Sequence, residues 1–279
     1  MAFESKGEFK NFEIAGSSLS VLDIGEGQPV MLGSSYLWDS AMWQPQIEAL
    51  SGRYRLLVPE LWGHGRSGAM PGDTGDLRGL AKQHLELLDR LGIERCAIVG
   101  LSVGGMWGAE LALLAPERVS ALVLMDTSLA AEPAPKRAAY FGMLDAIEAL
   151  GAVPDPVLQH ATPLFFAPAT FEQRPELPQQ FEARMRNWSA ERLRDSVAPL
   201  GRMIFGRREA LDELSALTMP SLVMTGAEDS ARLPAEGAAM AERMGCRFVE
   251  IPGAGHIANL EAPEFVTEAL TAFLAEALA

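Results

Sequence analysis

The sequence predicts an α/β fold built on a mostly parallel, doubly wound sheet with helices on both faces. Short, continuously apolar runs such as Cys-Ala-Ile-Val-Gly at 96–100 and Ala-Leu-Val-Leu-Met at 121–125 are typical of strands buried on both faces. These runs alternate with longer segments of helical periodicity. Such strand–helix alternation implies right-handed crossovers around a parallel sheet.

Each expected strand is a short apolar run bounded by turn residues. The runs lie at residues 19–24, 29–33, 54–59, 96–100, 121–126, 221–226 and 247–251. Helical patterns between and after them lie at residues 40–50, 76–91, 103–115, 234–244 and 263–278. Pro116 directly follows the third of these helical patterns, and proline cannot continue a helix.

The alternation stops over residues 129–217, where prolines are dense and short helical patterns appear at 136–150 and 179–194. We expect a helical cap inserted into one sheet domain, with core segments at 1–128 and 218–279 on either side. An insertion between late strands lies over the carboxyl ends of the sheet, where α/β proteins bind ligands. A disordered linker is the alternative, and the many aromatic residues of the segment argue against it.

Composition narrows the classes of partner. The chain of 279 residues is 48% hydrophobic and 22% charged, with a formal net charge of −14, which disfavours nucleic acids and anionic membranes. Two cysteines exclude a disulfide scaffold, and no apolar leader or spanning run is visible, so we expect a cytoplasmic protein. No P-loop, His-Glu-x-x-His or Cys-x-x-Cys motif occurs, so we expect no cofactor and no metal. A homodimer is left open.

The strongest local motif is Gly-Leu-Ser-Val-Gly at residues 100–104, which follows an apolar strand and opens a helix. A Gly-x-Ser-x-Gly motif in this strand–turn–helix context predicts a nucleophile elbow. The glycines allow a tight turn that lifts the hydroxyl of Ser102 above the sheet. Ser102 is therefore the candidate nucleophile.

A serine nucleophile needs a base, and the chain offers four histidines. His84 lies within a predicted helix and is expected at the surface, and His160 lies in the insertion, where it would be poorly fixed as a base. His64 lies in a glycine-rich turn, where it is expected to position the loop. His256 follows the last strand in a loop shaped by two glycines, and we assign it as the base.

A carboxylate should orient the imidazole and stabilise its protonated form. Asp229 follows the strand at 221–226, in the loop before the strand that leads to His256. Asp126, at the end of the strand at 121–126, is its rival, with a structural role as the other interpretation. Asp229 is favoured, and the resulting order along the chain is Ser, Asp, His.

Four motifs together make the chain resemble members of the α/β-hydrolase fold superfamily over nearly its whole length outside the insertion. They are Gly-Leu-Ser-Val-Gly-Gly at 100–105, Pro-Glu-Leu-Trp-Gly-His-Gly-Arg-Ser at 59–67, Gly-Ala-Glu-Asp at 226–229, and Gly-Ala-Gly-His-Ile-Ala-Asn-Leu-Glu-Ala-Pro-Glu-Phe at 253–265. The resemblance implies a sheet of the α/β-hydrolase type with a helical cap. Dehalogenases and epoxide hydrolases of this fold use an aspartate nucleophile, and residue 102 is a serine.

One loop departs from the usual family pattern. Family members usually carry His-Gly ahead of a tryptophan, and counting back from Trp43 places Ser34 and Ser35 on that pair. The resemblance then implies that the backbone N–H groups of Tyr36 and Val103 form an oxyanion hole. The 3-oxoadipate enol-lactonases also replace His-Gly ahead of a Met-Trp, and this chain is similar to them there.

We therefore expect a serine hydrolase that cleaves a carboxylic ester or lactone of a small to medium acyl substrate through an acyl-enzyme. The alternatives are a carbon–carbon bond hydrolase of the same fold and a binding protein of low activity that senses a ligand. Contacts to a small-molecule substrate are expected from Ser35, Trp38, Phe165 and Trp188. Seven arginines between residues 184 and 208 form either a solvated helical face or a site for a substrate carboxylate or an acidic carrier protein.

Overall fold

A computed structural model describes residues 7–279 of the chain. The first six residues lie outside the described part, so the beginning of the expected core segment 1–128 is not covered. Among residues 7–279, none of the helices combines the length and apolar character that crossing a bilayer requires.

The core is one sheet of eight strands in the order β1-β2-β4-β3-β5-β6-β7-β8. Strands β3 to β8 run parallel, whereas β1 and β2 form a hairpin, and β2 pairs antiparallel with β4. The strands are β1 (Glu8–Ile14), β2 (Ser17–Ile24), β3 (Gln28–Gly33), β4 (Tyr54–Pro59), β5 (Cys96–Leu101), β6 (Val119–Met125), β7 (Ser221–Gly226) and β8 (Arg247–Ile251).

The expected doubly wound sheet is confirmed, and all the expected strands are present within one or two residues of their predicted ends. Strand β1 is an additional strand that sequence reasoning missed. It lies at the edge of the sheet and most of its side chains are partly or fully exposed, so its sequence lacks a continuous apolar run. In the turn that joins it to β2, Ala15 has φ 49°. Asn, Asp or Gly is usual at such a position, so the sequence lacks the usual sign of a hairpin turn.

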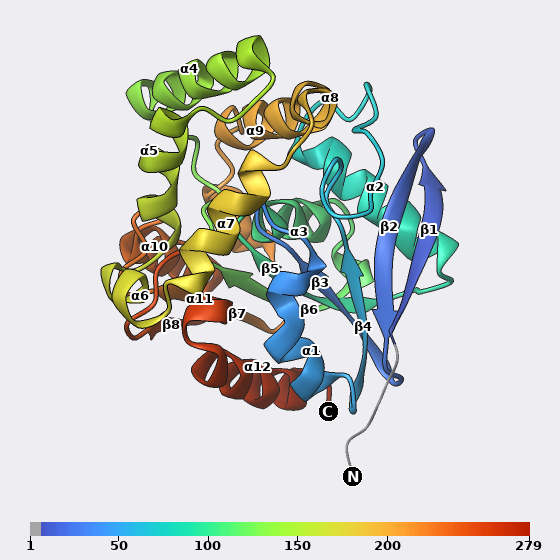
Figure 1. Ribbon diagram of the computed structural model, residues 1–279. Coiled ribbons are helices and arrows are strands. Elements are labelled where there is room, and N and C mark those ends of the chain that lie inside the picture. The colour runs from blue at the N-terminus through green and yellow to red at the C-terminus, as the bar shows by residue number, and fades with distance from the viewer. Residues whose placement is uncertain (1–6) are drawn as a thin grey trace.

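Helices cover both faces of the sheet (Figure 1). Helices α1 (Gln44–Leu50) and α12 (Pro263–Ala277) pack together on one face. Helices α2 (Leu77–Arg90), α3 (Val103–Leu114) and α10 (Pro234–Met244) lie on the other, with α3 buried against β5 and β6. Short helices complete the layers: η1 (Ser40–Trp43), η2 (Pro116–Arg118), η4 (Asp212–Ala216) and α11 (Ala258–Glu261).

Between β6 and β7 the chain forms a run of helices above the carboxyl ends of the strands, which we call the helical segment, residues 134–205 (Figure 1). It contains α4 (Ala134–Leu150), α5 (Asp155–Phe165), α6 (Pro168–Gln173), α7 (Glu176–Arg186), α8 (Ala190–Arg192), the π-helical turn η3 (Leu193–Val197) and α9 (Ala198–Phe205). The helix expected at 179–194 is interrupted, because Ser189 adopts an extended conformation and caps α8 through the N–H of Arg192.

Candidate functional site

Ser102 lies at the sharp turn between β5 and α3, with φ 56° and ψ −120°. A non-glycine residue in this region is strained and persists only where its surroundings hold it. Here the Ser102 N–H donates to the Met125 carbonyl at 2.9 Å, and the Ser102 carbonyl accepts from the Thr127 hydroxyl at 2.7 Å. The end of β6 therefore fixes the backbone of the turn.

The neighbouring glycines permit a close approach of three chain segments. A Cβ atom on Gly104 would collide with the backbone of Gly33, and one on Gly100 would collide with the backbone of Gly104. The end of β3 therefore lies directly against the start of α3. This contact brings the turn that follows β3 next to Ser102.

His256 and Asp229 meet on neighbouring loops at the carboxyl end of the sheet. His256 Nδ1 lies 2.9 Å from Asp229 Oδ2, and both side chains are buried. The other carboxylate oxygen accepts the N–H groups of Ala231 and Arg232 at 2.8 and 2.9 Å. Because Nδ1 donates to the carboxylate, the neutral ring keeps its lone pair on Nε2, and His256 lines the same cavity as Ser102.

Asp126, the rival carboxylate, lies in the same region without contacting a histidine among the described residues. It is fully buried at φ 45°, and its Oδ1 accepts the Gly226 N–H at 2.7 Å. Burial, followed by the negative charge of Asp229, raises the pKa of Asp126 well above its usual value. Its hydrogen bond ties the end of β6 to the end of β7.

A carboxylate that sequence reasoning missed holds the His256 loop to the helical segment. Glu261 accepts the N–H of Gly255 at 2.9 Å, the N–H of Ala167 at 2.8 Å and the hydroxyl of Thr170 at 2.6 Å. Burial raises the pKa of Glu261 above its usual value. Its position in the motif at 253–265 marked the loop, but nothing in the sequence identified its partners.

The expected oxyanion donors, Tyr36 and Val103, belong to two chain segments that meet beside Ser102. Val103 is the first residue of α3, so its N–H has no intrahelical acceptor. Tyr36 lies in the turn after β3, and within residues 7–279 its N–H makes no hydrogen bond to a backbone carbonyl. Leu37 follows at φ 73°, and its N–H donates to Nε2 of His64 at 3.2 Å.

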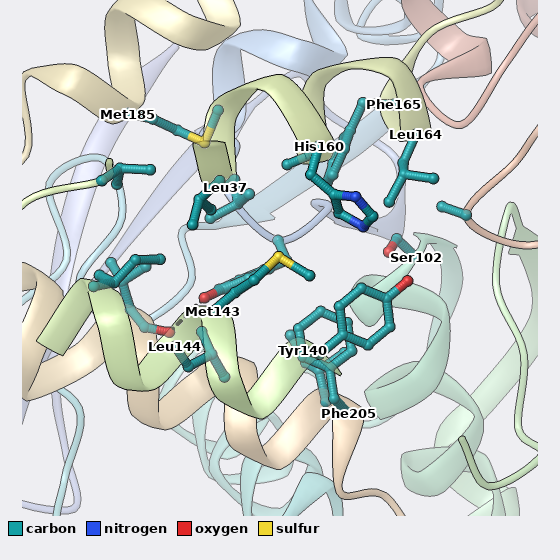
Figure 2. Close-up of a pocket in the computed structure, with 18 of the residues that line it drawn as sticks. Leu37, Ser102, Tyr140, Met143, Leu144, His160, Leu164, Phe165, Met185 and Phe205 are labelled. Atoms are coloured by element: carbon teal, nitrogen blue, oxygen red, sulfur yellow. Dashed lines mark hydrogen bonds between the residues drawn. The ribbon is translucent and has the colours of Figure 1, made fainter. Parts of the chain in front are cut away.

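A cavity opens above Ser102, between the sheet and the helical segment (Figure 2). Most of its lining side chains are aliphatic, aromatic or methionine. Figure 2 shows the hydroxyl of Tyr140 and the imidazole of His160 turned toward the side where Ser102 lies. The lining residues are Tyr36, Leu37, Ser102, Tyr140, Met143, Leu144, Ile147, Val153, Val157, His160, Ala161, Leu164, Phe165, Met185, Trp188, Val197, Ile204, Phe205, Ala231, Arg232 and His256.

The four expected substrate contacts separate into two groups. Phe165 and Trp188 line the cavity, whereas Ser35 and Trp38 are buried behind its wall. Trp38 stacks on Phe181 with ring centroids 5.5 Å apart. The Ser35 hydroxyl donates to the carbonyl of Tyr36 at 3.3 Å. Neither Ser35 nor Trp38 is among the residues that line this cavity.

The remaining histidines have different surroundings. His84 is buried, contrary to the expected surface position, because it lies on the inner face of α2 and stacks on Trp107 with centroids 3.8 Å apart. His64 is also buried, with Nδ1 2.8 Å from the Trp62 carbonyl, in keeping with its expected positioning role. Burial lowers the pKa of each to about 4. His160 lines the cavity.

The arginines between residues 184 and 208 are engaged by the chain itself. Arg192 and Arg194 donate to the carbonyls of Gly65 and Glu148, and none of the seven arginines lines the cavity. The geometry favours a structural role over recognition of a substrate carboxylate. The other five pair with carboxylates: Arg184 with Asp39, Arg186 with Asp155, Arg202 with Asp145, Arg207 with Glu132, and Arg208 with Glu110.

Comparison with known proteins gives one consistent family. The profile of the α/β hydrolase fold family matches residues 29–263. A 3-oxoadipate enol-lactonase of Acinetobacter baylyi is 25% identical over 261 residues, which cover 93% of this chain and 94% of that protein. A thermophilic esterase from Thermogutta terrifontis has a TM-score of 0.87 at 26% identity, covering 97% of this chain and 99% of the other. The enol-lactonase of Burkholderia xenovorans LB400 has a TM-score of 0.83 at 26% identity, covering 95% and 100%.

Proposed function

The chain belongs to the α/β hydrolase fold family, and on that premise we propose that it is a serine hydrolase that cleaves a carboxylic ester or a lactone through an acyl-enzyme. The observation that carries the proposal is the His256–Asp229 hydrogen bond beside a cavity that Ser102 and His256 both line. The similarity to an esterase and to enol-lactonases supports the class of substrate.

In the proposed acylation, the Ser102 hydroxyl attacks the carbonyl carbon of the ester while Nε2 of His256 accepts its proton. The Asp229 carboxylate holds the imidazole by Nδ1 and stabilises its positive charge. The carbonyl oxygen becomes an oxyanion, which the N–H groups of Tyr36 and Val103 stabilise. The tetrahedral intermediate collapses as the leaving alcohol takes the proton from His256.

Deacylation repeats these roles with water as the nucleophile. His256 accepts a proton from water as its oxygen attacks the acyl carbon, and returns a proton to the Ser102 oxygen when the acid leaves. In a lactone the alcohol and the acid belong to one molecule, so the ring opens and a single hydroxy acid is released. The same residues serve both substrates.

We propose that the helical segment is a cap that selects neutral, apolar acyl groups. The aliphatic and aromatic lining supports this selection, because an unpaired carboxylate in such a cavity would lose its hydration. Among residues 7–279, Arg232 is the one arginine or lysine of the lining, and its guanidinium lies 2.9 Å from the buried carboxylate of Glu132. A substrate carboxylate would therefore compete with an internal ion pair.

The test is a panel of p-nitrophenyl esters of increasing acyl length, lactones and a vinylogous diketone, measured with the wild-type protein and Ser102→Ala. We expect turnover of esters or lactones, and loss of at least about a thousandfold in kcat in Ser102→Ala. Ser20→Ala is the matched control, because Ser20 is also buried and its hydroxyl has no hydrogen-bond partner in the described chain.

Three results would contradict the proposal. Full activity in Ser102→Ala would show that Ser102 is not the nucleophile. Turnover of the diketone with inert esters and lactones would favour a carbon–carbon bond hydrolase. Stoichiometric labelling by a fluorophosphonate without turnover of any substrate would favour a ligand-sensing protein.

A further inference from the structure

The turn that carries the proposed oxyanion donor is held to the helical segment by the side chain of the same residue. The Tyr36 hydroxyl donates to the Val197 carbonyl at 2.7 Å, across 161 positions of sequence, and the bond is buried. Burial raises the pKa of this hydroxyl above its usual range, so it stays a donor across the accessible pH range. Tyr36 therefore lines the same cavity as Ser102 and reaches the helical segment with its hydroxyl.

The acceptor belongs to an unusual part of the helical segment. Val197 is the last residue of the π-helical turn η3, between α8 and α9, and it also lines the cavity. Turns of π-helix are rare and occur often at functional sites. The same turn is bonded to the core through Ser196, whose hydroxyl accepts the N–H of Met70 at 3.0 Å. The π-helical turn η3 is therefore bonded to the core at two points.

A second hydrogen bond, within the core, holds the turn after β3 that contains Tyr36 and Leu37. Leu37 has φ 73°, a conformation that costs a residue with a Cβ atom about 1–3 kcal/mol and needs support. Its N–H donates to Nε2 of His64, whose Nδ1 lies 2.8 Å from the Trp62 carbonyl. The chain directly after the Tyr36 N–H is thus held by two hydrogen bonds, one from the Tyr36 hydroxyl and one from the Leu37 N–H.

We propose that the Tyr36 hydroxyl is a positioning group for catalysis, which couples the helical segment to the oxyanion hole through Val197. The inference rests on the proposed function, because it assumes that the Tyr36 N–H stabilises an oxyanion. An oxyanion donor works only when it already points to where the charge develops. Docking of the helical segment would then set kcat as well as access to the cavity.

The first test is Tyr36→Phe, which keeps the backbone N–H and the ring and removes only the hydroxyl. We expect kcat for the preferred ester to fall about tenfold, because small misplacements of catalytic groups are costly, while KM stays within about twofold. Affinity for a boronic acid, whose adduct with serine is tetrahedral, should fall by a similar factor. A substrate-like amide, which stays planar, should bind unchanged.

Tyr54→Phe is the matched control, because Tyr54 is buried and its hydroxyl has no hydrogen-bond partner among the described residues. It should leave kcat and boronate affinity unchanged. Gly201→Ala is a second variant that keeps the hydroxyl but displaces it, because the new Cβ would lie 2.6 Å from the Tyr36 oxygen. It should reproduce the loss in kcat.

The proposal is overturned if Tyr36→Phe keeps wild-type kcat and boronate affinity, whatever its melting temperature. It is also overturned if boronate and amide affinities fall together, because that pattern indicates a collapsed cavity and not a misdirected donor. Neither result would contradict the proposed function as long as Ser102→Ala remains inactive.

Discussion

Asp229 and His256 are joined by a hydrogen bond of 2.9 Å between Oδ2 and Nδ1, and both side chains are buried. The second carboxylate oxygen of Asp229 accepts hydrogen bonds from two backbone N–H groups, so this carboxylate has a fixed orientation. Asp126 has a different environment, because within residues 7–279 its carboxylate accepts one hydrogen bond, from the Gly226 N–H, and its pKa is raised by burial. The two aspartates should therefore respond differently to the loss of negative charge.

We expect Asp229→Asn to lower kcat by about 10³–10⁴, because an amide favours the wrong imidazole tautomer and cannot stabilise the protonated ring. Asp126→Asn should retain kcat within about threefold, because an amide oxygen can still accept the Gly226 N–H. Steady-state kinetics on the preferred ester compare the two variants directly. The reverse pattern, with Asp126→Asn inactive and Asp229→Asn active, would transfer the role to Asp126.

The features that the sequence predicted share a short-range signature. Buried parallel strands are continuous apolar runs, and the turn at residues 100–104 is encoded by glycines whose Cβ atoms would collide with other backbone. The edge strand β1 lacks such a run because only part of it is buried. The fully buried strands were therefore predicted from their apolar runs, whereas the mostly exposed β1 was missed.

Features that depend on packing between distant segments were beyond sequence reasoning. Trp38 could be assigned to a pocket from its aromatic character, but its stacking on Phe181 of α7 depends on how the helical segment docks. His84 was expected at the surface, since a single polar residue does not show which face of a helix turns inward. The role of Glu261 likewise requires knowing that α6 lies over the His256 loop.

The two buried histidines predict a loss of stability in mild acid. Burial lowers the pKa of His64 and His84 from the usual 6.5 to about 4, so the unfolded chain binds more protons than the folded one between these values. Their contribution to stability is complete above about pH 6.5 and declines toward pH 4, by up to about 3 kcal/mol each. Urea denaturation at pH 7 and pH 4.5 measures the decline.

His84→Phe isolates one of these contributions, because it keeps an aromatic ring against Trp107 and removes the titrating group. The difference in unfolding free energy between pH 7 and pH 4.5 should be smaller in this variant than in the wild-type protein. The buried carboxyls Asp126 and Glu261, whose pKa values are raised, act in the opposite direction and are common to both proteins. Equal pH dependence in the two proteins would count against the assignment.

Two tryptophans on either side of the cavity wall should behave differently. Trp38→Ala removes a ring packed on Phe181 and under the Arg184 guanidinium, and should lower unfolding free energy by about 3–5 kcal/mol. Trp188→Ala enlarges the cavity and should shift the preferred acyl length upward, with a smaller cost in stability. Chemical denaturation and the ester panel measure both. A change in acyl preference in Trp38→Ala without loss of stability would indicate that Trp38 contacts the substrate.

A buried ion cluster lies beside the Asp229 loop. The Glu132 carboxylate pairs with Arg207 at 2.8 Å and Arg232 at 2.9 Å, and the three side chains are at most 5% exposed. Burial alone would raise the pKa of Glu132, but the two guanidinium groups outweigh it and lower the pKa to about 2. The stability that this shift reflects is present above about pH 4.5 and is lost as the pH falls toward 2.

Glu132→Gln leaves two buried cations without their shared carboxylate, so we expect the unfolding free energy at pH 7 to fall by about 3–5 kcal/mol. Glu213→Gln is the control, because that carboxylate pairs with Arg208 at a half-exposed position, where loss of an ion pair should cost much less stability. Replacing the whole cluster by apolar residues should recover part of the loss, because the desolvation cost of the charges disappears with them. If Glu132→Gln were as stable as Glu213→Gln, the guanidinium groups of Arg207 and Arg232 would have to be hydrated or paired elsewhere in solution.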